Sequence, residues 1–232
     1  MHIIVDERLH IEEEETLEKL GYKVIKCPKT PLVNPAISCH PDIQLFLIDQ
    51  KTIIVHKNIE IEFKNKLLAM NYDLIESAAS LSLNYPGDIL LNAYQTKEYF
   101  IHNINFTDSN LLVHSGNKKQ ISVKQGYTKC SILPISDKAF ITSDPSISSA
   151  LLPFGFDILK LPYGDILLPG YNYGFIGGCG GVSPKGELLI FGDLKNYIYY
   201  RDVLNFLLKY DIKPISLSSG KLKDRGSIFF LN

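Results

Sequence analysis

The sequence predicts an α/β protein in which five ββαβ units form a closed ring. One order of elements recurs along the 232 residues: an apolar run, a short turn, a second apolar run, an amphipathic helix and a short β-branched strand. The expected helices begin near residues 11, 59, 107, 145 and 199, and this spacing of roughly 40 to 50 residues is typical of propeller-like arrays. The first unit lacks its first strand, which residues 227–231 (SIFFL) can supply by pairing beside residues 3–5.

An open α/β sheet with accidental self-similarity is the alternative interpretation. A doubly wound sheet alternates single strands with helices, whereas here a two-strand hairpin precedes four of the five helices. This difference favours the ring. The units are expected within a single domain, at about residues 1–28 with 227–232, 40–77, 86–124, 127–162 and 172–218.

The first two units show the pattern most clearly. Unit one reads HIIVD, IEEEETLEKLG and YKVIKC, as strand, helix and strand. Unit two reads IQLFLI, a turn at residues 49–51, TIIVH, the helix IEIEFKNKLLAM and YDLIES. In that helix Ile59, Phe63, Leu67 and Met70 recur every three or four residues, so they share one face.

The remaining units repeat this order. Unit three reads DILLNAY, EYFIHN, FTDSNLLVHSG and KQISVK; unit four reads CSILPI, AFITS, DPSISSALLPFGF and DILKLP. In unit four Asp144 is expected to cap the helix, followed by Pro145 at a position where its missing N–H does no harm. Unit five reads FIGGCGGV, ELLIFG, YRDVLNFLLKY and KPISLS.

Composition excludes several function classes. The 24 Lys and Arg residues nearly balance the 25 Asp and Glu residues, which argues against a nucleic-acid or membrane-surface partner. No run approaches 18 apolar residues, and the acidic N-terminus has no signal-peptide pattern. Four cysteines without CxxC spacing argue against a zinc knuckle or a disulfide scaffold. We therefore expect a cytoplasmic protein with free thiols; the sequence gives no expectation for its oligomeric state.

Two short motifs carry possible chemistry. His40-Pro41-Asp42 opens unit two, and a spacing of two on a strand would point both polar side chains to one face. There the imidazole can move protons while the carboxylate orients it or holds a cation. A surface histidine before a turn proline is the alternative.

The second motif, residues 126–133 (GYTKCSIL), leads from a small-residue loop into Cys130 and an apolar strand, where a small buried cysteine is the alternative. On that strand Lys129 would point away from Cys130, so it is not expected to activate the thiol.

The five-fold ring resembles the pentein, or β/α-propeller, superfamily. This superfamily contains arginine deiminase, dimethylarginine dimethylaminohydrolase, agmatine deiminase, amidinotransferases and a ribosome anti-association factor. More narrowly, the chain looks like an uncharacterised clostridial-type family with this guanidine-modifying-enzyme fold, through ISCHPDIQLF, VKQGYTKCSILP and YGFIGGCGG. The resemblance implies that Cys130 is a nucleophile forming a thiouronium-type intermediate, His40 a general acid/base, and Asp42 an orienting group and cation ligand. One unit separates the His and Cys motifs, as in these enzymes, although a further unit follows the Cys motif here.

One departure from the enzymes concerns substrate recognition. Where their pattern has a carboxylate that grips the guanidinium, residues 175–182 (FIGGCGGV) have glycine at Gly178. This loss puts arginine-type substrates in doubt, because a guanidinium would lack a bidentate partner. Asp42 could still serve, and Asp6 or Asp165 could enter the mouth of the ring.

Two functions from different classes remain open. A Cys-dependent hydrolase or amidinotransferase acting on a small amidine- or guanidine-like molecule requires a central pocket with Cys130 and His40 at its floor. A non-catalytic binding module, like the anti-association factor, would use the ring as a rigid platform and predicts a large polar or apolar patch on one ring face and no such convergence. No metal or cofactor is expected. The glycine-rich segment fails GxGxxG, and polar residues in apolar strands could equally be satisfied structural groups. The expected substrate-binding residues are Asp6, Arg8, Asn92, Gln125, Gly178 and Cys179.

Overall fold

Five short apolar runs form the middle strands of five three-stranded sheets in the computed structural model, which describes residues 1–231. Each middle strand pairs antiparallel with one neighbour and parallel with the other, and one helix connects the parallel pair. The strands, sheet by sheet with the middle strand second, are β15 (Phe229–Leu231), β1 (His2–Asp6) and β2 (Lys23–Cys27); β3 (Leu45–Leu47), β4 (Thr52–Val55) and β5 (Asp73–Glu76); β6 (Tyr94–Gln95), β7 (Tyr99–His102) and β8 (Lys119–Ser122); β9 (Ile132–Ser136), β10 (Ala139–Thr142) and β11 (Asp157–Lys160); and β12 (Gly180–Val182), β13 (Glu187–Ile190) and β14 (Lys213–Ser216).

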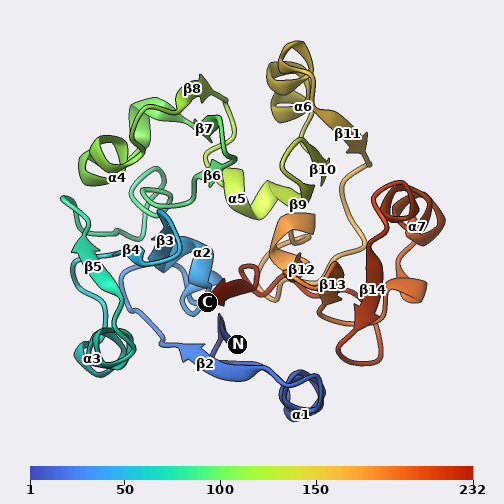
Figure 1. Cartoon of the computed structure of the whole chain (residues 1–232), viewed down its shortest axis with the longest axis horizontal. Helices are drawn as coiled ribbons and strands as arrows, with labels where there is room; N and C mark the ends of the chain where they lie inside the picture. The colour runs from blue at the N-terminus through green and yellow to red at the C-terminus, as the bar shows by residue number, and fades with distance from the viewer. Residues whose placement is uncertain (232) are drawn as a thin grey trace.

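The connecting helices begin close to the positions expected from the sequence, and Figure 1 places them on the outside of the molecule. They are α1 (Ile11–Lys19), α3 (Ile61–Ala69), α4 (Ser109–His114), α6 (Pro145–Leu151) and α7 (Tyr200–Leu208). The expected cap of α6 is confirmed: Asp144 accepts hydrogen bonds from the backbone N–H groups of Ser146 and Ile147 at 2.8 and 2.9 Å. None of the helices between residues 1 and 231 has the length and apolar character needed to cross a bilayer.

The middle strands are mainly apolar, and side chains on both of their faces are buried. In β4, Ile53 and Val55 join one hydrophobic cluster and Ile54 joins another on the opposite face. The first of these clusters also contains Ile4 from β1, so it packs one sheet against the next. Alternating side chains of one strand therefore hold two neighbouring sheets in place.

The C-terminal strand completes the first sheet, as the sequence predicts. β15 pairs antiparallel with β1, with Leu231 opposite His2 and Phe229 opposite Ile4. No ladder hydrogen bonds join one sheet to another within residues 1–231, so the five sheets do not form one continuous closed sheet.

Short helical turns precede several first strands where the sequence analysis expected strand. These turns are α2 (Pro41–Gln44), α5 (Thr128–Ser131) and the 3-10 helix η4 (Ile176–Cys179). The expectation of strand was wrong at these positions, because a stretch of four residues is too short for its pattern to separate strand from helix, and Pro41 suits the first turn of a helix. Asn92 likewise lies before β6 and not within it. Figure 1 shows α2 and α5 near the centre of the molecule. The other short 3-10 helices are η1 (Pro35–Ile37), η2 (Ile104–Phe106), η3 (Leu152–Phe154) and η5 (Leu194–Asn196).

Candidate active site

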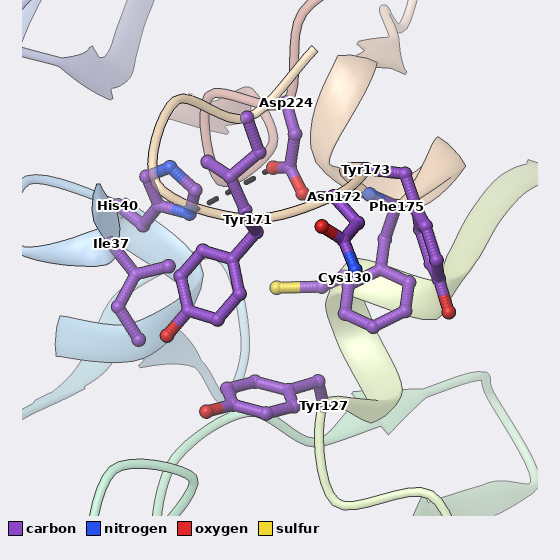
Figure 2. Close-up of a pocket in the computed structure, with 10 residues that line it drawn as sticks. Ile37, His40, Tyr127, Cys130, Tyr171, Asn172, Tyr173, Phe175 and Asp224 are labelled. Carbon is purple, nitrogen blue, oxygen red and sulfur yellow. Dashed lines mark hydrogen bonds and ion pairs between the residues drawn. The ribbon is translucent and has the colours of Figure 1, made fainter. Parts of the chain in front are cut away.

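A pocket of about 240 Å³ brings His40 and Cys130 together. Both side chains line it, and Asp224, from the segment that leads into β15, is the third ionisable group (Figure 2). In this view the sulfur of Cys130 points into the space bounded by His40, Tyr171 and Tyr127. One reactive atom each from His40, Cys130 and the neighbouring Asp42 lie within 4.8 Å of one another.

Cys130 is held by two polar groups behind the pocket. Its thiol donates a hydrogen bond to Oδ2 of Asp42 at 3.1 Å, and the side-chain amide of Asn92 donates to Sγ at 3.2 Å. Asn92 also accepts hydrogen bonds from the backbone N–H groups of Lys129 and Cys130, at 2.9 and 3.2 Å, which fixes the α5 turn. Burial, and then the charge of Asp42, raises the pKa of the Cys130 thiol well above its ordinary value. The thiol is therefore protonated at rest, and Asp42 accepts its hydrogen bond.

Lys129 is also part of the site, contrary to the expectation that it points away. Consecutive side chains diverge by about 100° on a helix instead of about 180° on a strand, so Lys129 and Cys130 both reach the centre. Nζ of Lys129 donates to the hydroxyl of Ser227 at 2.9 Å, and that hydroxyl lies 2.9 Å from Oδ2 of Asp42 and 2.8 Å from the carbonyl oxygen of Gly177. Burial raises the pKa of Asp42, and the charge of Lys129 opposes that shift. The ammonium group thus compensates a buried carboxylate that binds the thiol.

His40 lies between two carboxylates. Its Nδ1 is 3.8 Å from Oδ1 of Asp224, and its Nε2 is 3.8 Å from Oδ2 of Asp6. Neither ring nitrogen has a hydrogen-bond partner among the described residues, although both are buried. Burial lowers the pKa of His40, and the two aspartates oppose that shift. His40 lines the pocket, and a neutral imidazole with an unpaired ring nitrogen can accept a proton from a bound molecule.

Asp224 occupies the space that Gly178 leaves open. A Cβ atom added to Gly178 would lie 1.8 Å from Oδ1 of Asp224, so the carboxylate takes the place of a side chain. Asp224 accepts hydrogen bonds from the backbone N–H groups of Phe175 and Gly226 at 2.8 and 3.1 Å. Burial raises its pKa, with His40 opposing the shift. The site therefore has a second carboxylate after all, and the sequence reasoning missed it because it looked for that carboxylate at position 178 itself.

The other residues expected to bind substrate do not line the pocket. Asp6 forms an ion pair with Arg8 at 2.5 Å and lies behind His40. Gln125 donates to Asp144 and accepts from the backbone N–H of Tyr127, so it positions the loop instead of facing the cavity.

Cys179 is buried among apolar residues and donates to the carbonyl oxygen of Phe175 at 3.3 Å. Asn92 holds the thiol of Cys130 from behind the pocket, and Gly178 leaves the space that Asp224 fills. Asp165 pairs with Lys221 at 2.7 Å and does not line the pocket.

His40, Asp42 and Cys130 are also the one set of three ligand types close enough to hold a metal ion among residues 1–231. An imidazole, a carboxylate and a thiolate are ligands that Zn²⁺ accepts. In the structure Cys130 and Asp42 are already hydrogen-bonded to each other.

Comparisons with known proteins agree on the fold. An amidinotransferase from Microseira wollei in the saxitoxin biosynthetic pathway superposes with a TM-score of 0.54 and 12% identity, covering 94% of this chain and 88% of that chain. An inosamine-phosphate amidinotransferase from Streptomyces griseus gives a TM-score of 0.57 and 13% identity, covering 95% and 80%. A dimethylarginine dimethylaminohydrolase from Pseudomonas aeruginosa, complexed with citrulline, gives 0.55 and 9%, covering 94% and 92%.

These are pentein-fold enzymes, and at such low identities the likeness shows the fold alone. No curated protein sequence matches the chain. Over residues 4–229 the sequence matches the family of unknown function DUF6873, and the chain therefore belongs to that family.

Proposed function

We propose that the protein is a Cys130-dependent enzyme that cleaves a C–N bond in a small molecule carrying a guanidinium or amidinium group. One observation carries the proposal: a thiol, a neutral imidazole and a buried carboxylate line the same pocket. A cationic, planar group with several N–H donors matches a floor that offers carboxylate oxygens and an unpaired ring nitrogen. The pentein fold shared with amidinotransferases and dimethylarginine dimethylaminohydrolase supports this reaction class.

The proposed first step is a substitution at the central carbon of the cation. Sγ of Cys130 forms a bond to that carbon, and the thiol proton passes through Asp42 or His40 to the departing nitrogen. The C–N bond then breaks, and an amine or ammonia leaves with that proton. From a guanidinium the enzyme now carries a cationic S-alkyl thiouronium group; from an amidinium it carries the corresponding thioimidate cation, whose hydrolysis gives an amide.

The second step releases Cys130. A water molecule adds to the thiouronium carbon, the C–S bond breaks, the sulfur regains a proton, and one proton leaves to solvent with a urea-type product. If an amine attacks instead of water, the amidino group is transferred. His40 is the proposed base for either attacking molecule, because its nitrogen has no competing partner.

The carboxylates have distinct proposed roles. Asp42 takes the thiol proton, since it is the hydrogen-bond acceptor of Cys130. Asp224 lines the pocket and is the proposed ligand of the cation. Lys129 supplies a positive charge, so that Asp42 and Asp224 are not two uncompensated negative charges in a buried site.

We also propose that the five units form one closed, propeller-like ring within a single domain. Five hydrophobic clusters support this, since each packs residues from two neighbouring units. One of them packs Ile3 and Val5 from the first unit against Leu189 and Phe191 from the fifth. The ring is what lets segments from different units meet at one pocket.

The binding-module alternative is less well supported. It requires no convergence of Cys130 and His40, whereas both line one pocket.

A pair of alkylating agents tests the proposal. 2-Chloroacetamidine is a cation and 2-chloroacetamide is its neutral counterpart, and both label thiols. We expect the amidine to label Cys130 faster than the amide, as followed by intact-mass and peptide mass spectrometry. In Asp224→Asn this preference should shrink, because the charge that attracts the amidinium is gone. In Cys130→Ser, neither reagent should label a residue that lines the pocket. Equal labelling of Cys130 by both reagents in the unaltered protein would contradict a cation site.

A further inference from the structure

The walls of the pocket differ sharply from its floor. Above Cys130, His40 and Asp224 the cavity is lined by apolar and aromatic side chains and by the neutral amide of Asn172, and no lysine or arginine of the described chain is among the lining residues. The cations around the site are already engaged: Arg8 binds Asp6 and the carbonyl oxygens of Pro35 and Ala36, and Lys129 binds Ser227. Arg225 pairs with Glu13 at 3.3 Å. A carboxylate on a bound molecule would therefore lose its hydration without gaining a positive partner, which is costly.

The aromatic side chains form a continuous band that extends beyond the pocket. Each ring contacts the next with centroid separations of 5.3 to 6.3 Å. In order along the band the rings are Phe106, Tyr85, Tyr127, Phe175, Tyr173 and Tyr163. Tyr127, Tyr173 and Phe175 line the pocket itself, as does Tyr171, so the band leads from the cavity out onto the surface (Figure 2).

Much of this aromatic surface is exposed to solvent. Tyr85 is 51% exposed, Tyr171 46%, Tyr163 40% and Tyr173 38%. Two of the hydroxyl groups are held by carboxylates: Tyr127 donates to Asp88 at 2.5 Å and Tyr163 donates to Asp144 at 2.9 Å. These bonds fix ring orientation, so the faces of the rings remain available for stacking. Exposed aromatic side chains gathered at one pocket mark a ligand-contact surface more than scattered surface residues do.

We infer that the substrate is a guanidine or amidine with an apolar or aromatic substituent and without a carboxylate. The cation binds at the floor near Asp224 and Cys130, and the substituent lies along Tyr127, Tyr171 and Tyr173. This inference rests on the proposed function, because it assigns the remainder of the molecule whose cation Cys130 attacks. Free arginine fits poorly, since its carboxylate would meet the aromatic walls.

Protection of Cys130 against 2-chloroacetamidine measures binding without requiring turnover. The competitors are phenethylguanidine, which has an aromatic substituent, methylguanidine, which has almost none, and arginine. Each ring contact contributes about 3- to 10-fold in affinity. Phenethylguanidine should therefore protect at concentrations at least tenfold lower than methylguanidine, and arginine should protect worse than phenethylguanidine.

Variants of the walls localise the effect. Tyr171→Ala and Tyr173→Ala should each weaken protection by phenethylguanidine about 3- to 10-fold and leave methylguanidine unchanged. Tyr200→Ala, on α7 and outside the pocket lining, is the matched control and should change neither. Tyr173→Arg adds a cation to the wall and should improve protection by arginine.

The outcomes separate the two claims. If arginine protects Cys130 as well as phenethylguanidine does, or if the tyrosine variants leave both guanidines unchanged, the substrate inference is wrong while the cation site stands. If 2-chloroacetamidine shows no preference for Cys130 over the neutral amide, the proposed function fails, and the inference fails with it.

Discussion

Replacing Gly178 with alanine should disrupt the site through Asp224, although the change adds a single methyl group. The added Cβ would lie 1.8 Å from Oδ1 and 2.5 Å from Cγ of Asp224, and all three of its nearest atoms belong to that carboxyl group. The side chain of Asp224 is 1% exposed and lines the pocket, so the new methyl group would push it out of its present place and toward the cavity. Moving it breaks its hydrogen bonds from the N–H groups of Phe175 and Gly226, at 2.8 and 3.1 Å.

Each buried donor left unpaired costs about 1 to 3 kcal/mol, so losing both should lower the free energy of unfolding of Gly178→Ala by about 2 to 6 kcal/mol. Urea denaturation followed by far-UV circular dichroism measures this loss. The decisive comparison is a double-mutant cycle with Asp224→Ala, which removes the three atoms that the new Cβ would meet. In that background Gly178→Ala should cost less than about 1 kcal/mol. Equal costs in both backgrounds would refute the assignment of Asp224 to this space.

Three further perturbations test the electrostatics and the architecture. Asp42→Asn removes a charge that raises the pKa of the Cys130 thiol, so neutral iodoacetamide should alkylate Cys130 faster at pH 8; a slower reaction would contradict that role. Hydrogen bonds to the Asp144 carboxylate lower its pKa in the folded protein. The stability that this carboxylate contributes is therefore present above the ordinary carboxyl pKa and is lost as the pH falls through the pKa of the folded state. Urea titrations of Asp144→Ala should therefore show a loss of about 1 to 2 kcal/mol at pH 7 that shrinks below about pH 4. Removing residues 228–232 uncovers the edge of β1 and should cost several kcal/mol or cause aggregation, and a monomer with an unchanged urea midpoint would count against the pairing.

The sequence predicted the repeating architecture well because its strongest pattern is also the structural one. Apolar runs such as TIIV become strands buried on both faces, and amphipathic segments become the outer helices that begin at Ile11, Ile61, Ser109, Pro145 and Tyr200. The pairing of β15 with β1 followed from a missing strand at one end of the chain and a spare one at the other.

The details of the site were harder to predict because they depend on short turns. Cys130 and Ser131 were expected to begin a strand, with Lys129 judged as part of it, whereas residues 128–131 form a helical turn; this single error also gave Lys129 the wrong direction. Asp224 was missed because the glycine at 178 looked like a lost carboxylate, whereas it marks space for a side chain 46 residues further along the chain (224 − 178). A usable signal was present: the segment before residues 229–231 occupies the same place in its unit as His40-Pro41-Asp42 does in the second.

The position of Asp224 and Ser227 just before β15 has a consequence for synthesis of the protein. Both residues belong to the last part of the described chain to leave the ribosome, and Ser227 is held at a φ of 73°, a backbone conformation that residues other than glycine rarely adopt. That conformation is adjacent to β15, which pairs with β1, a strand made long before it. Until residue 231 has emerged, Cys130 and Asp42 lack the serine, the second carboxylate and the final strand that surround them. A partly made chain therefore cannot assemble the complete pocket, and an intact pocket reports that both ends of the first sheet have met.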